Sequence, residues 1–187
     1  AAGLPFIDRM RLPVLGRLKP GLRVGRALAG GACLQQALYN SAGAQRAISE
    51  LEAEAAPDLV VAHLVRTVPW LDALRSSSVP VLVDIQDALS AQYREARGRS
   101  TGWRGWAMAL EERRVAEAER DAVRRADGVT FISARDAAAV DCSTTPVAIA
   151  GAAFLGAAVA GGPSTAAVPG RIGFLGNLRT ASNRDMA

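Results

Sequence analysis

The 187-residue chain contains few of the side chains that bind metals or form disulfides. It has two cysteines, Cys33 and Cys142, which lie far apart in the sequence, and a single histidine, His63. No CxxC or Cys/His spacing is present, so we expect no zinc site. Two widely separated cysteines also form no disulfide framework, and reduced thiols in a cytosolic protein are the expectation.

Aromatic residues make up only 5% of the chain, although half of its residues are hydrophobic. The net charge is +4 and the pI is about 9.8, because arginines are numerous at the amino-terminal end and from Arg94 to Arg125. A basic domain attracts phosphate groups on nucleic acids, anionic lipids or nucleotides. No arginine cluster is interleaved with aromatic residues, so nucleic acid is not an expected partner. A GC-rich genome, which favours arginine and alanine, explains the same composition without any partner.

Residues 142–170 carry no charge and contain a long run of small apolar residues. A membrane span needs about 20 strongly apolar residues. Between Pro146 and Pro163 the run consists mainly of alanine and glycine, with few large side chains. The composition therefore favours a strand followed by a flexible linker over a transmembrane helix.

Short apolar runs bounded by proline, glycine or aspartate predict four strands, which begin near Pro57, Val79, Asp127 and Pro146. Continuous apolar runs of this length are typical of strands buried on both faces of a parallel sheet. The stretch "GGACLQQALYNS", from Gly30, is a candidate for a further strand.

Helical patterns separate these runs. The segment "NSAGAQRAISELEAEAAP" has apolar residues at helical spacing and is closed by Pro57, and "TVPWLDALRSSS" predicts a shorter helix. The longest predicted helix spans residues 102–125, with basic residues near its negative end and Gly128 after it. Strands alternating with helices predict βαβ units with right-handed crossovers, and hence an α/β fold with a Rossmann-like, doubly wound parallel sheet.

Ligands of such sheets bind outside the carboxyl ends of the strands. Polar residues follow three of the predicted strands: His63, Arg66 and Thr67; Gln86, Asp87 and Ser90; and Ser133, Arg135 and Asp136. Each group also has a structural explanation, since Asp87 or Ser90 can cap the next helix and Ser133 fits an N-cap. Three polar groups at one edge favour a cleft there.

The long predicted helix carries two glutamates on one face, Glu112 and Glu119. Their spacing separates them by roughly 10 Å, which is long for a concerted acid/base pair. We therefore expect a solvated or salt-bridged face without a catalytic role. Asp121 and Arg125 are spaced for an i,i+4 ion pair.

The order of these elements resembles that of family 4 glycosyltransferases of the GT-B fold, most of all the bacterial branch associated with cell-surface polysaccharide synthesis. The resemblance rests on the helix containing Glu112, Arg114 and Glu119, on the strand "VTFIS" that follows it, and on the final segment "RIGFLGNLRTASNRDMA". In that segment the glycines and asparagines of the family pattern are Gly173, Gly176, Asn177 and Asn183.

The resemblance implies three regions. Residues 1–150 are expected to form the acceptor-side Rossmann-like domain, incomplete at its start, and residues 151–170 a linker rich in glycine, alanine and proline. Residues 171–187 are expected to begin a donor-binding domain that the chain does not complete. We therefore expect the chain to be a fragment of an enzyme, and to be inactive alone.

The resemblance also implies a retaining, hexosyltransferase-like transfer of a sugar from a nucleotide-sugar to a glycan or lipid-linked acceptor, without a metal or other cofactor. The acceptor-side residues are His63, Arg66, Gln86, Asp87 and Ser133, and the diphosphate-binding residues are Gly176, Asn177 and Arg179. The catalytic residues are not assigned. Gln86 stands where many relatives have a histidine, and an amide cannot take a proton at neutral pH, so it is expected to position the substrate.

An arginine-rich first domain suits a lipid-phosphate acceptor at an anionic membrane surface. The expected location is therefore the cytoplasm, with peripheral contact at the inner face of the plasma membrane. Two alternatives stay open. One is a non-catalytic, basic Rossmann-like module that binds anions or a partner, and the other is a different GT-B enzyme, such as a sugar-nucleotide epimerase.

Overall fold

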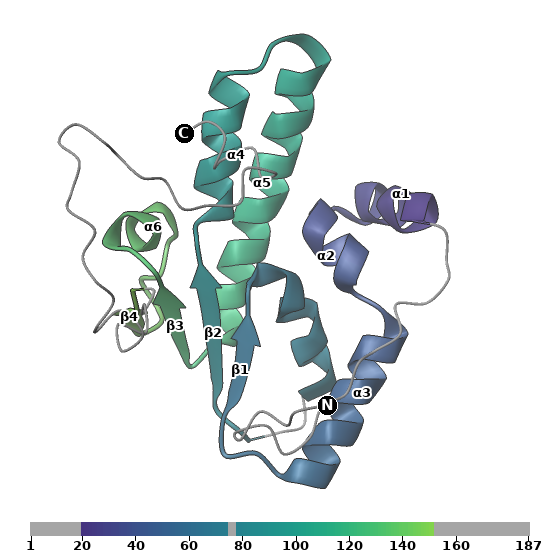
Figure 1. Cartoon of the computed structure of the whole chain (residues 1–187), viewed down its shortest axis with the longest axis vertical. Coiled ribbons are helices and arrows are strands. Elements are labelled where there is room, and N and C mark those ends of the chain that lie inside the picture. Colours follow the sequence, from purple (N-terminus) through teal and green to yellow (C-terminus); the bar gives the residue numbers. More distant parts are fainter. Residues whose placement is uncertain (1–19, 75–77, 152–187) are drawn as a thin grey trace, which may run out of the picture. The chain divides into compact units, whose positions relative to one another are not determined.

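The computed structural model describes residues 20–74 and 78–151 of the chain (Figure 1). The expected donor-binding segment, residues 171–187, lies outside the described residues, as does the expected linker apart from Gly151. The division into three regions therefore stays a prediction.

A parallel four-stranded sheet forms the centre of the described structure. Its strands are β1 (Val60–His63), β2 (Val81–Gln86), β3 (Gly128–Phe131) and β4 (Val147–Ile149), and they pair in the order β1-β2-β3-β4. Each falls within one of the four predicted apolar runs, and helices connect them. The predicted α/β, Rossmann-like fold class is therefore confirmed. Among the described strands the order in space follows the order in the chain, so no reversal of strand order occurs there.

The helices are α1 (Pro20–Gly30), α2 (Leu34–Tyr39), α3 (Ala42–Ala55), the 3-10 helix η1 (Val65–Leu74), α4 (Leu89–Gly98), α5 (Gly102–Arg125) and α6 (Ala134–Ala139). The prediction of the long helix is confirmed at both ends. The expected short helix is η1, which contains Pro69. Because proline donates no backbone hydrogen bond and clashes with the preceding turn, it disfavours a regular α-helix here.

The prediction of a further strand after Gly30 is wrong, because residues 34–39 form α2. Leucine, glutamine and alanine dominate this helix, and all three have high helix propensity. The only buried apolar side chain nearby is Cys33, which precedes the helix and joins the core. The next helix, α3, lies within the segment predicted to be helical, and it is capped by the Ser41 hydroxyl, which accepts a hydrogen bond from the Ala44 amide at 3.1 Å.

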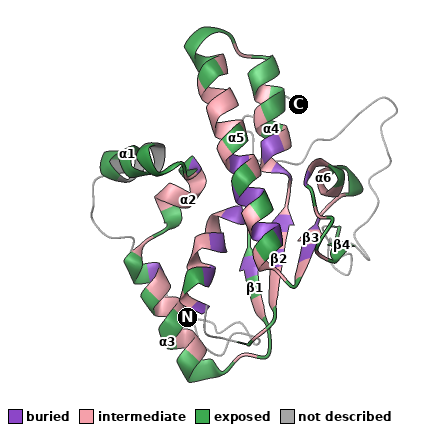
Figure 2. Ribbon diagram, turned by 180° about the vertical axis from the view of Figure 1, so that it is seen from behind, coloured by how far each residue is buried: buried purple, intermediate pink, exposed green. Residues whose placement is uncertain are grey.

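One face of the sheet holds the core. The side chains of Ala62, Val83, Ile85, Val129 and Phe131 alternate along the strands and are almost completely buried. They pack against apolar residues of η1 and α5, and α5 lies in front of the strands in Figure 2. We call this the covered face. Alternation along β1, β2 and β3 therefore sends every second residue to the core, whereas the three residues of β4 are all exposed.

The opposite face of the sheet, which we call the open face, is more polar and more exposed. Its residues include Val61, whose side chain is 54% exposed, and the neighbouring positions His63, Asp84 and Thr130 on three adjacent strands. In the described part of the chain, the expectation of strands buried on both faces is therefore wrong for β1, and it is also wrong for β4, whose residues are all exposed. An apolar run did not distinguish a strand buried on both faces from one buried on a single face.

Candidate functional site

The carboxyl ends of β1 and β2 have unusual backbone conformations. Leu64 and Gln86 have positive φ angles, of 70° and 63°, in the left-handed region that side chains with a Cβ rarely adopt. The Leu64 amide donates to the Asp84 carbonyl at 2.8 Å, and the Ile132 amide donates to the Gln86 carbonyl at 3.0 Å. A bulge between residues 84 and 86 accompanies this conformation. Such strained positions persist where neighbouring contacts hold them, and they concentrate at functional sites.

A row of polar side chains crosses the open face at this edge. Asp84 lies between His63 and Thr130 on the neighbouring strands. Its Oδ2 atom is 2.9 Å from His63 Nδ1, and its Oδ1 atom accepts a hydrogen bond from Thr130 Oγ1 at 2.7 Å. A carboxylate only accepts, so His63 carries a proton on Nδ1, and in the neutral ring Nε2 is left as an acceptor.

We call His63, Asp84 and Thr130 the polar row. The His63 side chain is 53% exposed, so its outer nitrogen is accessible to a ligand, whereas that of Asp84 is only 25% exposed. Sequence reasoning selected His63 but missed Asp84 and Thr130. A usable signal was present, because Asp84 interrupts the apolar run "VLVDIQ" and parallel register places it beside the last residue of β1.

A second group of contacts at the same edge is centred on Asp136 of α6. The Ser133 hydroxyl accepts a hydrogen bond from the Asp136 amide at 3.1 Å and donates one to the Asp136 carboxylate. The other carboxylate oxygen accepts from the Ala88 amide at 3.1 Å. The N-cap explanation of Ser133 is therefore confirmed, and Asp136 joins the β3–α6 turn to the start of α4.

The start of α4 is capped by side chains from other helices rather than by its own. Ala88 is the N-cap residue and supplies no side-chain hydrogen bond, so a capping role for Asp87 or Ser90 is wrong. The Ser90 amide instead donates to Glu119 Oε1 of α5 at 3.1 Å, and Asp136 accepts from the Ala88 amide. Asp87 is left available at the edge. Partial burial raises its pKa, and the nearby negative charge of Asp136 adds to this.

Glu119 differs from the expectation of a solvated glutamate face. It is only 1% exposed, and burial raises its pKa although hydrogen bonds from Ser90 oppose the shift. Glu112 fits the expectation, since it pairs with Arg94 at 3.0 Å and with Arg97 at 3.1 Å. The difference arises because this part of α5 packs against the sheet and α4, whereas Glu112 lies farther along the hairpin that α4 and α5 form.

The remaining acceptor-side candidates are less closely associated. The Arg66 guanidinium lies over the Tyr39 ring of α2, 4.9 Å from its centroid. Gln86 contributes its backbone carbonyl to the sheet edge. The structure therefore places His63 in the polar row, and Asp87 and Ser133 around Asp136. The assignment of all five residues to an acceptor site stays a prediction, and Gly176, Asn177 and Arg179 lie outside the described residues.

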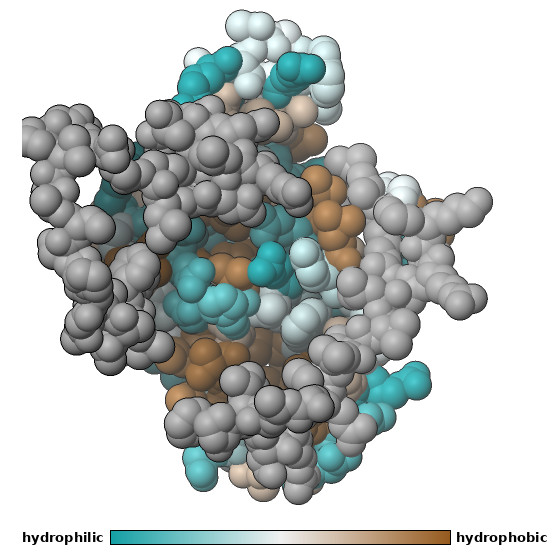
Figure 3. Space-filling model, viewed as in Figure 1, coloured by the Kyte–Doolittle hydropathy of each residue, from teal (hydrophilic) through white to brown (hydrophobic). Residues whose placement is uncertain are grey.

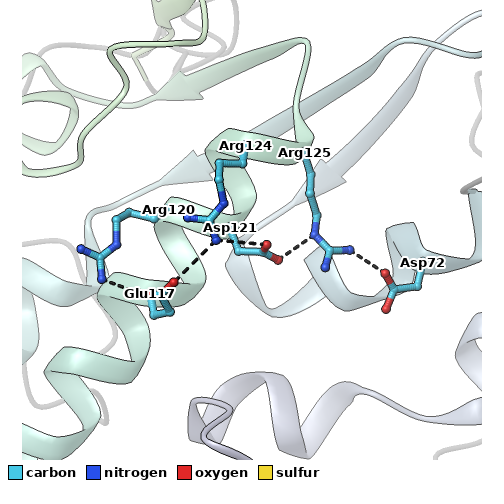
Figure 4. A network of polar contacts seen from close by, with 6 residues as sticks. All are labelled: Asp72, Glu117, Arg120, Asp121, Arg124 and Arg125. Carbon is cyan, nitrogen blue, oxygen red and sulfur yellow. Dashed lines mark hydrogen bonds and ion pairs between the residues drawn. The ribbon is translucent and has the colours of Figure 1, made fainter.

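An ion-pair network runs along α5 and contacts η1 near the other end of the strands (Figure 4). The predicted pair of Asp121 and Arg125 is present at 2.7 Å, and the same guanidinium contacts Asp72 of η1 at 2.6 Å. The network continues along α5 through Arg124 to Glu117. It therefore links two helices that cover the sheet.

A Rossmann-like parallel sheet with polar groups at the carboxyl ends of its strands belongs to the class of α/β ligand-binding domains. Residues 2–148 match the family model of the glycosyl transferase 4-like domain, so the chain belongs to that family. Comparisons with curated proteins and with solved structures give no match. The matched range contains the whole polar row and the Asp136 group. The family indicates glycosyl transfer, with a sugar donor and an acceptor as substrates.

Within residues 20–74 and 78–151, no helix has the length and apolar character to cross a bilayer. The same residues contain no cluster of three or more histidine, cysteine, aspartate or glutamate side chains arranged to hold a metal. Cys33 and Cys142 carry free thiols, and burial raises the pKa of both.

Proposed function

We propose that this domain is the acceptor side of a retaining GT-B glycosyltransferase. The enzyme transfers a hexose from a nucleotide-sugar to a glycan or lipid-linked acceptor in bacterial cell-envelope polysaccharide synthesis. The family match supports the general activity, and the resemblance of the final segment to a donor-domain start supports the GT-B arrangement. The observation that carries the acceptor assignment is the polar row, at the edge of the sheet where ligands of this fold class bind.

In this proposal His63 binds the acceptor. Asp84 holds the imidazole through Nδ1, and Thr130 holds Asp84, so the ring has one orientation before substrate arrives. The exposed Nε2 atom then accepts a hydrogen bond from an acceptor hydroxyl. Asp84 is a positioning residue, because it acts through the histidine. Gln86 ends β2 and Asp87 follows it at the same edge, and we assign both residues hydrogen bonds to the acceptor.

The donor side of the proposal concerns Gly176, Asn177 and Arg179. Backbone amides at a glycine turn and helix start bind phosphate oxygens, and they stabilise the charge that develops on a diphosphate leaving group. Arg179 adds a positive charge to that site. These groups neutralise the leaving group without a metal, and closure of the two domains completes the site. In this proposal sugar transfer requires the donor-binding domain.

The test compares Asp84→Asn and His63→Ala in the whole enzyme, with Val61→Ala as the matched control on the same face. Loss of one substrate hydrogen bond of about 1.4–2.8 kcal/mol lowers kcat/KM for the acceptor by roughly tenfold to a hundredfold. The KM for the nucleotide-sugar should not change. The double variant should be no worse than His63→Ala, because Asp84 acts only through the histidine.

Two results would contradict the proposal in distinguishable ways. Unchanged acceptor kinetics in both variants would remove the acceptor role of the polar row and leave the activity standing. No sugar transfer from any nucleotide-sugar by the whole enzyme would reject the transferase itself, in favour of a binding module or another GT-B reaction.

A further inference from the structure

The far end of the α4–α5 hairpin combines exposed tryptophans with arginines, so the statement that no arginine cluster is interleaved with aromatic residues is wrong for this segment. We call residues 97–106, "RGRSTGWRGW", the hairpin tip. The tip projects beyond the strands in Figures 1 and 2. Trp103 is 75% exposed and Trp106 is 69% exposed, the largest values among the exposed large hydrophobic residues of the described chain. Two such side chains in water are unfavourable unless something covers them.

The two indoles lie on one side of α5, because residues three apart on a helix are neighbours. Trp70, by comparison, is partly buried in η1. In Figure 3 the tip is pale and teal, as expected for tryptophan, glycine and arginine on a hydropathy scale, and brown atoms appear closer to the sheet. An indole has an apolar body and an N–H donor, and for this reason tryptophan concentrates at membrane–water interfaces.

The charge of the tip has a single sign. It contains Arg97, Arg99 and Arg104 and no aspartate or glutamate. Arg97 pairs with Glu112, whereas Arg99 and Arg104 form no ion pair with any described residue. The Arg104 guanidinium lies over the Trp103 ring, 5.7 Å from its centroid. The amino terminus of α5 is also at the tip, and its helix dipole adds partial positive charge.

The two ends of α5 therefore differ. At the carboxyl end the arginines are neutralised by Asp72, Glu117 and Asp121 (Figure 4). At the amino end two arginines and two tryptophans face solvent together. At the carboxyl end of α5, neighbouring carboxylates balance the charge of the arginines. At the amino end they do not, so charge and apolar surface are available there for a partner.

The tip backbone is fixed before any partner arrives. Gly102 has a φ of 60°, which favours glycine, and a Cβ at Gly105 would lie 3.0 Å from the Ser100 carbonyl oxygen. The Ser100 hydroxyl donates to the Ala96 carbonyl at 2.8 Å. A compact turn of this kind presents its side chains with little loss of conformational entropy on binding.

We propose that the hairpin tip docks on the surface of an anionic lipid bilayer. The indoles insert at the level of the head groups, and Arg99 and Arg104 bind lipid phosphates. A lipid surface suits this arrangement better than a nucleic acid, because it takes up both indoles and arginines without requiring aromatic rings spaced along a strand. The proposal does not depend on the sugar-transfer proposal, and it assigns a surface for the expected peripheral membrane contact.

The test measures cosedimentation of the full chain with vesicles of phosphatidylcholine alone or mixed with phosphatidylglycerol. We expect binding to the mixed vesicles, a blue shift of tryptophan emission, and weaker binding at high salt. Trp103→Ala/Trp106→Ala and Arg99→Gln/Arg104→Gln should each reduce binding by roughly tenfold or more, since each arginine near an anionic surface contributes about 1 kcal/mol. Circular dichroism checks that the variants are folded.

The matched control is Arg26→Gln/Arg46→Gln, which removes the same charge from exposed positions on α1 and α3. It should bind nearly as well as the wild-type chain. The proposal fails if the control loses as much binding as the tip variant, or if the wild-type chain binds neither vesicle. It also fails if the tip variants abolish self-association or oligonucleotide binding while leaving lipid binding unchanged, because the tip would then serve a second copy or a nucleic acid.

Discussion

The two faces of the sheet are built from the same strands but carry different side chains. On the covered face, Val83 and Phe131 are fully buried beneath α5 and η1. On the open face, Asp84 joins His63 and Thr130 through hydrogen bonds, next to the half-exposed Val61. Residues adjacent in sequence therefore serve separate purposes: one set determines how the chain packs, and the other forms a site.

The largest loss of stability is expected for a substitution on the covered face. Phe131→Ala removes a fully buried ring from the end of β3 and leaves a cavity beneath the helices. We expect a loss of about 3–5 kcal/mol in the free energy of unfolding, measured by urea denaturation. Val61→Ala on the open face should cost less than about 1 kcal/mol. Equal losses would show that both faces are packed in solution, and the distinction between them would be abandoned.

The next largest effect is expected for Glu119, a carboxylate that is buried on the covered side. Glu119→Ala leaves the Ser90 amide without its acceptor, and we expect a loss of about 2 kcal/mol in stability at neutral pH. Glu119→Gln keeps an oxygen acceptor and should be closer to the wild-type chain. Thermal or urea unfolding of both variants provides the measurement, and a milder effect of alanine than of glutamine would contradict the capping role.

The same pair predicts a pH dependence. Burial raises the pKa of Glu119 above its ordinary value of 4.5, so between those two pKa values the folded state binds more protons than the unfolded state. Its contribution to stability therefore falls as the pH rises from about 4.5 to the raised pKa. Glu119→Gln should remove this part of the fall in stability with rising pH. If the free energies of unfolding of the wild-type chain and Glu119→Gln changed in parallel with pH, a contribution from Glu119 would be excluded.

The smallest loss of stability is expected when the ion-pair network between α5 and η1 is broken. Asp72→Asn removes one of the two carboxylates that pair with Arg125, the one at 2.6 Å, but the side chains of Asp72 and Arg125 are partly exposed. We expect a loss below about 1 kcal/mol, which decreases further at high salt. A loss as large as that for Phe131→Ala would mean that ion pairs rather than apolar burial hold α5 on the sheet.

Much of the covered face was predictable from the sequence, because burial leaves a local pattern. Apolar runs marked all four strands, and the long helix and the Ser133 cap followed from spacing and residue type. Glu119 was assigned to a solvated face because helical spacing does not specify which part of a long helix meets the sheet. The segment after Gly30 was ambiguous because its apolar residues are few, and helix propensity decided its structure.

The site was predictable only in part, because it depends on pairing between strands. His63 was selected as a polar residue at a strand end, but its partners Asp84 and Thr130 lie inside other strands. Only the register of the sheet brings these residues together. Capping of α4 by Glu119 and Asp136 is likewise a contact between distant segments, which no local pattern indicates.

Asp136 connects two loops at the carboxyl ends of the strands. Its backbone amide and carboxylate bind the Ser133 hydroxyl in the β3–α6 turn, and the same carboxylate accepts a hydrogen bond from the amide of Ala88, the residue before α4. Two loops that are far apart in the sequence are therefore joined through one side chain. Loss of the Asp136 carboxylate would remove a contact from both loops at once.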